Sequence, residues 1–443
     1  MASIKGREPP MRADSAGRGP ATTRVLFVSP PRRAVQFFAE TARRFPVDWH
    51  FFSVKPPVRS VLHQLGLRCL PGDGRLVKAD QAEATVHLPG YKRGEQLSGR
   101  LARVQQRIAA TLERAIDQQG IDALLVWNGA GLIGATAAQI ARRRGLPILF
   151  GENGYFPDTL QLDPAGVNQA SSATEFVRDR RYLGYVPPKH EANGGDDDIC
   201  VRPVKPTAWS RLGPELRRLL TPAAWAWLRP TPHARLPEQL PPDLPPYVFV
   251  PLQVSKDTQL KQYSPLVGND FGLLLDHLSA ALAQLRPDWR IVVKPHPAEH
   301  HHVQVGYRAW LRRWPNVVFA TAPSSIALIQ GAQAVVTVNS TVGFEGIVHN
   351  KPVVTLGGNF YCFVPLVNPV ERLEDLPAVL QAALEQPQDV AARQQFLDYV
   401  RHEFLIDCGY RRITPRQMAH LVAAIEQRVA AASAASVSSA LDG

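Results

Sequence analysis

The sequence predicts an α/β protein with two Rossmann-like domains and a cleft between them. Short runs of β-branched and aromatic residues alternate with segments of helical spacing, and this alternation occurs on each side of a proline-rich stretch. The 443 residues are enough for two domains that each bury a core. Strands that alternate with helices form a mainly parallel sheet, whose ligands bind at the carboxyl ends of the strands.

The first domain is predicted over residues 23–200. The preceding lead at 1–22 lacks the hydrophobic stretch of a signal peptide, so we expect it to be basic and disordered. A run of β-branched and aromatic residues at 24–29 predicts the first strand, and helical spacing follows it at 34–44. Further strands are predicted at 47–54, 123–127 and 147–150, with a helix that ends near 144.

The second domain is predicted over residues 246–390. Its strands are expected at 247–251, 290–294, 316–319, 334–338 and 352–356, with helices that include 272–285 and 325–330. Alternating apolar and charged faces predict terminal helices over 391–429. The Ala/Ser-rich tail at 430–443 is predicted to be disordered.

The stretch at 201–245 is a linker or insertion rich in Pro, Trp and Arg. Trp209, Trp225 and Trp227 interleave with arginines. Trp favours the membrane–water boundary and Arg favours anionic head groups, so this pattern is typical of a membrane contact. A helical hairpin packed on the first domain explains the pattern equally well.

The composition limits the kinds of partner that we expect this protein to bind. A net charge of +11 fits an anionic partner. The basic residues form no nucleic-acid-binding signature, which favours anionic lipid and a phosphorylated substrate. No run approaches the roughly 18 to 20 apolar residues of a membrane span, and the four cysteines form no paired motif. We therefore expect a cytoplasmic protein that lies peripherally on the inner face of the inner membrane.

A candidate anion site follows the fourth strand of the second domain. Asn339, Ser340 and Thr341 stand where this strand ends, and Gly343 lets the backbone approach a ligand as a helix begins. Free N–H groups and hydroxyls at a helix N-terminus suit a phosphate or a carboxylate. Glu345, one turn along, is placed to accept hydrogen bonds from a ribose. The alternative interpretation is that Ser340 only caps the helix.

A lysine and a histidine are predicted at the same edge of the sheet. The strand at 290–294 delivers Lys294 and His296 there, between prolines that fix the backbone, and both side chains suit an anionic substrate. Residues 296–300 also match the H-x-x-E-H pattern of inverted zinc peptidases. We expect no metal, because the prolines predict an extended turn and no third ligand is evident.

Two carboxylates are predicted to face each other across the cleft. Asp257 lies in the loop after the strand at 247–251, together with Gln253 and Gln259, and Glu152 follows the last clear strand of the first domain. Loops that carry Asp, Asn and Gly are commonly only turns. Carboxylates at facing strand ends of two domains instead indicate nucleophilic or acid–base chemistry.

These segments together resemble the capsule polysaccharide synthesis family, the KpsS/KpsC-type β-Kdo transferases. Each family motif occurs in the expected order, and the single module resembles the KpsS type more than the tandem KpsC type. The matching residues are Glu152, Gly154 and Tyr155 with Gly166, Val167 and Asn168; Gln253, Asp257 and Gln259; Lys294 to Pro297; and Ser340, Gly343, Phe344 and Glu345.

The resemblance implies a GT-B-like fold and a retaining enzyme that transfers β-Kdo from CMP-Kdo. Within it, Asp257 is the expected nucleophile and Glu152 the general base. No metal or cofactor is needed for CMP to leave once its charge is neutralised. Tyr155 and Asn168 are the expected acceptor-binding residues. The expected donor-binding residues are Gln253, Gln259, Lys294, His296, Asn339, Ser340, Thr341, Gly343 and Glu345.

The resemblance leaves the acceptor as a lipid or a glycan, including a phosphatidylglycerol-type primer at the inner membrane. Capsule assembly and export proteins are expected as further partners, and nucleic acid is not. Two alternatives stay open: a UDP-sugar-dependent transferase or epimerase of the same fold, and a non-catalytic scaffold of capsule assembly.

Overall fold

The computed structural model describes most of the two predicted domains. The described residues are 23–77 without 33, 36 and 39–46; 85–88; 96–188; 199–200; 237–297 without 256; 310–408; and 412–430 without 415, 416, 418, 420, 428 and 429. The predictions for the lead at 1–22, for the Trp-rich part of the insertion and for the tail after 430 lie outside these residues.

The first domain is built on a seven-stranded sheet in the order β16-β8-β7-β6-β1-β2-β3. The five strands from β7 to β3 are parallel, as predicted, whereas β8 and β16 are antiparallel to their neighbours. The strands are β1 (Thr23–Val28), β2 (Val47–Phe52), β3 (Cys69–Leu70), β6 (Ala123–Trp127), β7 (Ile148–Asn153), β8 (Thr159–Asp163) and β16 (Leu405–Asp407).

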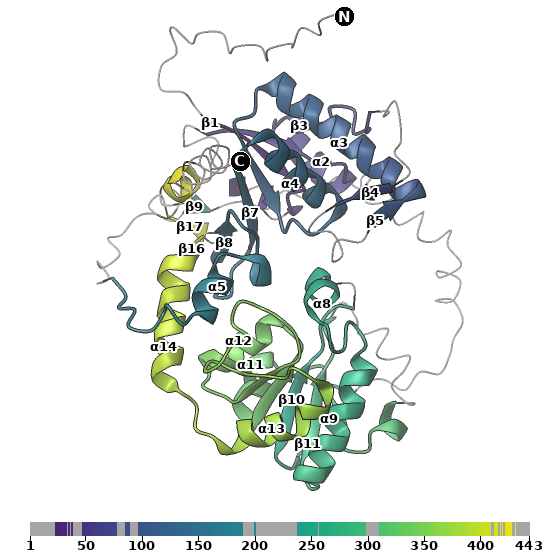
Figure 1. Ribbon diagram of the computed structural model, residues 1–443, viewed down its shortest axis with the longest axis vertical. Helices are drawn as coiled ribbons and strands as arrows, with labels where there is room; N and C mark the ends of the chain where they lie inside the picture. Colours follow the sequence, from purple (N-terminus) through teal and green to yellow (C-terminus); the bar gives the residue numbers. More distant parts are fainter. Residues whose placement is uncertain are drawn as a thin grey trace, which may run out of the picture.

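Helices and a small hairpin complete this domain (Figure 1). The long helix α3 ends at Gly120, whose φ of 59° is the left-handed conformation that a helix end commonly adopts. The remaining elements are α2 (Pro56–Gln64), α3 (Gly99–Gln119), α4 (Leu132–Arg144) and the hairpin of β4 (Thr85–His87) with β5 (Gln96–Ser98).

The second domain contains a six-stranded, fully parallel sheet in the order β12-β11-β10-β13-β14-β15. This is the doubly wound order of a Rossmann fold, which confirms the predicted class and places the topological switch point between β10 and β13. The strands are β10 (Tyr247–Pro251), β11 (Arg290–Lys294), β12 (Val317–Phe319), β13 (Ala334–Thr337), β14 (Val353–Thr355) and β15 (Asn368–Pro369).

The central strands β10, β13 and β14 are fully buried, because helices cover both faces of the sheet, and their sequences are rich in valine. Two Rossmann-like domains that meet at the carboxyl ends of their strands form a GT-B-like fold. The helices are α8 (Thr258–Tyr263), α9 (Phe271–Leu285), α11 (Ser325–Gly331), α12 (Thr341–Val348) and α13 (Leu376–Glu385).

The domain boundaries differ from the prediction in one respect. Helix α5 (Ala173–Arg178) follows β8 in the chain, yet Ala173, Val177 and Tyr182 pack into the core of the second domain with Phe344 and Phe396. This stretch belongs to the second domain by packing, although it falls within the predicted first domain. Its apolar side chains find a larger buried surface there, which sequence position alone does not reveal.

The chain then returns to the first domain near its end (Figure 1). Helix α14 (Val390–Tyr399) continues into a π-helical turn (Val400–Phe404) and then into β16, which extends the first sheet. A further strand, β17 (Arg412–Ile413), pairs with β9 (Ile199–Cys200). The prediction of helices alone over 391–429 was therefore incomplete. In the described part of the chain, no helix is both long and apolar enough to cross a bilayer.

Arg393 attaches α14 to the second domain. Its guanidinium, 1% exposed, donates hydrogen bonds to the carbonyl oxygens of Leu366 at 2.7 Å and Lys351 at 2.9 Å, and to Oε1 of Gln388 at 2.6 Å. Burial lowers the pKa of Arg393 to about 10, so it stays charged at neutral pH. The arginine satisfies carbonyl groups that no other described side chain reaches.

Replacing Arg393 by Ala should reduce the free energy of unfolding by about 2 to 5 kcal/mol, because it leaves buried carbonyl groups without donors. Urea unfolding measures the change. Arg372→Ala is the matched control, since Arg372 bonds an exposed neighbour, Glu374, and should unfold like the wild type. Equal midpoints for the two variants would contradict this account of Arg393.

Candidate active site

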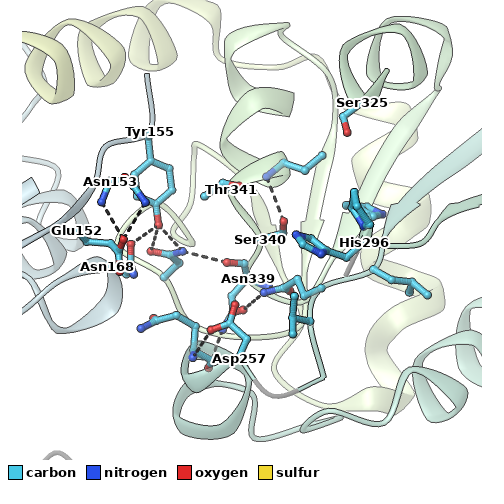
Figure 2. Close-up of a pocket in the computed structure, with 18 of the residues that line it drawn as sticks. Glu152, Asn153, Tyr155, Asn168, Asp257, His296, Ser325, Asn339, Ser340 and Thr341 are labelled. Atoms are coloured by element: carbon cyan, nitrogen blue, oxygen red, sulfur yellow. Dashed lines mark hydrogen bonds between the residues drawn. The ribbon is translucent and has the colours of Figure 1, made fainter. Parts of the chain in front are cut away.

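A cavity of about 610 Å³ lies between the domains, where strands of both sheets end. Its size is that of an ordinary small-molecule site. In Figure 2, Glu152 and Tyr155 approach it from one side and His296 and Ser340 from the other. It is lined by Asn128, Glu152, Asn153, Gly154, Tyr155 and Asn168 from the first domain, and by residues 251–254, Asp257, Gln259, 294–297, Ser325, 339–342 and Asn359 from the second.

Glu152 reaches the cavity from the carboxyl end of β7. One carboxylate oxygen accepts a hydrogen bond from Nδ2 of Asn128 at 2.9 Å, and the other accepts from the backbone N–H of Asn153 at 2.9 Å. Burial raises the pKa of Glu152, against the effect of these hydrogen bonds. The carboxyl group is therefore held in a fixed position and has an increased affinity for a proton.

Asp257 reaches the cavity from the second domain, where it caps the N-terminus of α8. Its Oδ1 accepts a hydrogen bond from the backbone N–H of Gln259 at 2.9 Å. Burial raises the pKa of Asp257, while this hydrogen bond and the charge of His296 lower it. One carboxylate oxygen is thus fixed by the helix, and the side chain still lines the cavity.

The structure brings the two predicted carboxylates into one cavity. They are close enough for the charge of Asp257 to raise the pKa of Glu152, although burial is the larger cause of that shift. One carboxylate comes from each domain, as the sequence predicted. The pair can provide a nucleophile and a proton acceptor on the two sides of a bound sugar.

Basic groups and a helix N-terminus line another part of the cavity. Lys294 is the last residue of β11, and its ammonium group donates to the carbonyl oxygen of Pro323. His296 follows in the same loop. Ser340 caps α12 by accepting a hydrogen bond from the N–H of Val342 at 3.2 Å, and it also lines the cavity. Thr341 also lines this part of the cavity. These groups together suit a phosphate or a carboxylate.

Buried amides fix the backbone around this anion site. Nε2 of Gln253 donates to Oδ1 of Asn339 at 2.9 Å, and the N–H of Asn339 donates back to Gln253 at 3.3 Å. Nδ2 of Asn339 reaches the carbonyl oxygens of Gln259 and Gly358, each at 3.2 Å. These side chains join the ends of β10 and β13, the switch point, to the loop after β14.

Tyr155 links the two domains instead of standing free for an acceptor. Its hydroxyl donates to Oδ1 of Asn168 at 2.8 Å and accepts from Nδ2 of Asn359 at 2.8 Å. Its ring packs on Phe344 and Phe360, with ring centroids 5.1 and 4.8 Å away. Tyr155 and Asn168 line the cavity, but the hydroxyl of Tyr155 and the amide oxygen of Asn168 are already hydrogen-bonded within the protein.

Two of the predicted donor-binding residues do not line the cavity. A Cβ atom on Gly343 would lie 2.5 Å from the hydroxyl oxygen of Tyr361, so this glycine allows close packing within the domain. Glu345 points from the next turn of α12, where burial raises its pKa and the charge of Lys294 lowers it. Gly343 lies about half a turn around α12 from Thr341 and so faces away from the cavity, whereas Glu345 lies about one turn farther along the helix than Thr341.

Sequence reasoning missed Asn128, Asn153, Ser325 and Asn359. Asn128 and Asn359 each follow a strand that the sequence predicts, within WNG and GGN triplets. An asparagine directly after a buried parallel strand is the signal that would have found Asn128, whereas Asn359 lies four residues past the end of β14. Ser325 begins a helix after β12 and gives no comparable pattern.

The described residues contain no cluster of three or more side chains suited to holding a metal ion. Of the H-x-x-E-H match, His296 lines the cavity, whereas 298–300 lie outside the described residues.

Known proteins resemble this chain in both sequence and fold. It is 30% identical over 297 residues to protein FixF of Sinorhizobium fredii, a match that covers 67% of this chain and 63% of FixF. Residues 227–369, which carry Asp257, Lys294 and Ser340, match the family described as capsule polysaccharide biosynthesis protein. Over these residues the chain is similar to the capsule polysaccharide synthesis family.

Two further proteins are similar to this chain. The capsule polysaccharide export protein KpsS of Escherichia coli is 24% identical over 282 residues, which cover 55% of this chain and 69% of KpsS. Among solved structures, the KpsC β-Kdo 2,7 transferase of Thermosulfurimonas dismutans superimposes with a TM-score of 0.39 at 18% identity. That superposition covers 74% of this chain and 90% of the other.

Replacing Glu152 by Gln should make the protein progressively more stable than the wild type as the pH rises. Burial raises the pKa of this carboxyl in the folded state above its unfolded value of about 4.3. The wild type therefore keeps its full stability below the unfolded pKa and loses part of it as the pH rises through the folded pKa. The variant has no carboxyl group at this position, so its stability does not fall with pH for this reason.

Thermal unfolding midpoints at pH 4 and pH 8 test this expectation. The difference between variant and wild type should favour the variant more strongly at pH 8. Glu113→Gln, on the exposed face of α3, controls for the loss of one carboxylate from the surface. A difference that is the same at both pH values would show that burial does not disfavour the charged form of Glu152.

Proposed function

We propose that this protein is a retaining glycosyltransferase that moves β-Kdo from CMP-Kdo to a hydroxyl acceptor in the synthesis of capsule or surface polysaccharide. The observation that supports this proposal most directly is the pair of partly buried carboxylates, one from each domain, in a cavity that also holds basic groups and a helix N-terminus. An inverting transferase needs one base, whereas retention through a covalent intermediate needs a nucleophile as well.

The donor's negative charges are assigned to the second domain. Lys294, His296 and the N-terminus of α12 would neutralise the phosphate of CMP and the carboxylate of the sugar, which makes CMP a better leaving group. Ser340 and Thr341 would add hydroxyl hydrogen bonds. Glu345 lies beside Lys294 but outside the cavity lining, so we do not assign it to the ribose.

In the first step, a carboxylate oxygen of Asp257 attacks the anomeric carbon. The bond from that carbon to the phosphate oxygen breaks, and CMP leaves with the electron pair. The product is a glycosyl ester of Asp257 with inverted configuration. The cap that α8 places on Oδ1 fixes one oxygen and leaves the other for attack.

In the second step, an acceptor hydroxyl oxygen attacks the same carbon, and its proton passes to Glu152. The bond to Asp257 breaks, the carboxylate is regenerated, and the second inversion restores the original configuration. A raised pKa suits Glu152 to this task, because it brings proton affinity closer to the working pH.

The cellular setting is part of the same proposal. The names of relatives refer to capsule polysaccharide export and modification, and the net charge of +11 fits an anionic membrane surface. We propose that the protein acts in the cytoplasm at the inner membrane, on a lipid or glycan acceptor such as a phosphatidylglycerol-type primer, together with capsule assembly and export proteins.

Replacing Asp257 by Asn should abolish transfer, by about a thousandfold or more, because the amide is a poor nucleophile. The assay combines CMP-Kdo, a panel of acceptors and mass spectrometry of the product. Asp270→Asn is the matched control, because Asp270 caps α9 in the same way but lies outside the cavity. Unimpaired transfer by the Asp257 variant would refute the assigned nucleophile, and turnover of UDP-sugars alone would refute the donor.

Replacing Glu152 by Gln should slow the second step more than the first, because the acceptor hydroxyl loses its base. Intact-protein mass spectrometry after incubation with CMP-Kdo should then show a Kdo adduct, and peptide mapping should place it on Asp257. An adduct on another residue would contradict the mechanism while leaving a covalent intermediate in place.

A further inference from the structure

A second, smaller cavity of about 110 Å³ also lies between the domains. Asn128 and Gln259 line both cavities and form the boundary between them. Most of the remaining wall consists of alanines and glycines from the turn after β6, from α4 and from the loop at 165–170. The space is too small for a nucleotide, and it suits one part of a ligand, such as a hydroxyl or an anionic group, with the rest of the ligand outside it.

The two boundary residues are bonded to the two carboxylates. Asn128 donates its side-chain N–H to Glu152, and Gln259 donates its backbone N–H to Asp257, each at 2.9 Å. The smaller cavity therefore shares its boundary with the residues that hold both carboxylates, and none of the basic groups assigned to the donor lines it. Such a position suits an acceptor hydroxyl.

Gln259 has unmet hydrogen-bonding capacity at this boundary. The residue is 8% exposed, and its buried Oε1 has no hydrogen-bond partner among the described residues. A buried polar atom without a partner is unfavourable, so a ligand that donates a hydrogen bond there gains affinity. A hydroxyl-bearing ligand meets that condition.

Arg142 adds a positive charge to the smaller cavity. It stands in a run of three arginines at the end of α4, and the next two pair with acidic residues of α3: Arg143 with Glu113 and Arg144 with Asp117. Arg142 is exposed and is one of the residues that line the cavity, and no described residue forms an ion pair or hydrogen bond with its guanidinium. A guanidinium in this position suits a phosphate or a carboxylate.

We propose that the smaller cavity is the acceptor subsite and that it takes a hydroxyl-bearing acceptor with an anionic group bound by Arg142. The inference rests on the function proposed for the main cavity. The acceptor oxygen forms the new bond to the anomeric carbon, its proton passes to Glu152, and the carboxylate of Asp257 departs. The anion is either a phosphate, as in a glycerophosphate head group, or the carboxylate of an acidic sugar.

Arg142→Ala, Arg142→Lys and Arg143→Ala form the test series, since the first two alter the cavity and the third alters its ion-paired neighbour. Initial rates are measured with a glycerophosphate acceptor, an acidic-sugar acceptor and a neutral glycoside. Arg142→Ala should raise KM for an anionic acceptor about tenfold, the value of one charge-assisted hydrogen bond. Arg142→Lys should restore part of the loss, and Arg143→Ala should match the wild type.

The anionic acceptor whose KM rises in Arg142→Ala shows whether Arg142 binds a phosphate or a sugar carboxylate. The KM of the donor and the rate of donor hydrolysis without acceptor should stay unchanged in all three variants. Equal kinetics of Arg142→Ala and Arg143→Ala with every acceptor would overturn the subsite and leave the proposed transferase intact. A loss of the same size with the neutral glycoside would also overturn it.

A binding measurement separates the subsite from the proposed function. Calorimetric titration with glycerol 3-phosphate and with the acidic sugar, in the presence of CMP, needs no turnover. Binding that depends on Arg142 in a protein that transfers no sugar would support the anion site and refute the transferase. Absence of Arg142-dependent binding of either ligand would overturn the subsite even if transfer is observed.

Discussion

The hydroxyl of Tyr155 is the contact on which the geometry of the cavity depends. It donates to Asn168 of the first domain and accepts from Asn359 of the second, so one oxygen atom joins both sides. Asn359 also donates to the carbonyl oxygen of Asn339 at 3.0 Å, which connects this contact to the anion site. The aromatic packing around Tyr155 holds its ring in place beside these hydrogen bonds.

Burial of the two carboxylates is unfavourable for folding and useful for chemistry. Each is partly shielded from bulk water, each has a raised pKa, and each keeps backbone or amide donors that hold it in place. The protein tolerates this because large apolar cores surround both sheets. The folded state thus stores an unfavourable charge arrangement that a bound substrate is able to use.

The sequence alone was sufficient to predict strands of both sheets and the polar residues at their carboxyl ends. Valine-rich runs bounded by polar turns located β10 and β11 at their observed limits, and the carboxyl-edge rule brought Glu152 and Asp257 to one cavity. The features that the sequence did not predict are those that depend on tertiary packing. The rotation of α12 removed Gly343 from the site, and α5 packed on the domain that follows it in the chain.

The contacts of Tyr155 and Asn168 likewise depend on tertiary structure that the sequence does not predict. A tyrosine in a glycine-rich loop is compatible with ligand binding and with packing alike, and only its partners distinguish the two. Those partners lie as far as 204 positions away in the chain, at Asn359, beyond the reach of any local pattern.

The strand β16 has a consequence for how the protein is made. It pairs with β8, whose partner residues Leu160 and Gln161 precede Leu405 and Ile406 by more than 240 positions. During synthesis on the ribosome, β8 remains an unprotected edge until nearly the whole second domain has emerged, and such edges invite pairing between nascent chains. The first domain therefore completes its sheet only after the second domain has been translated.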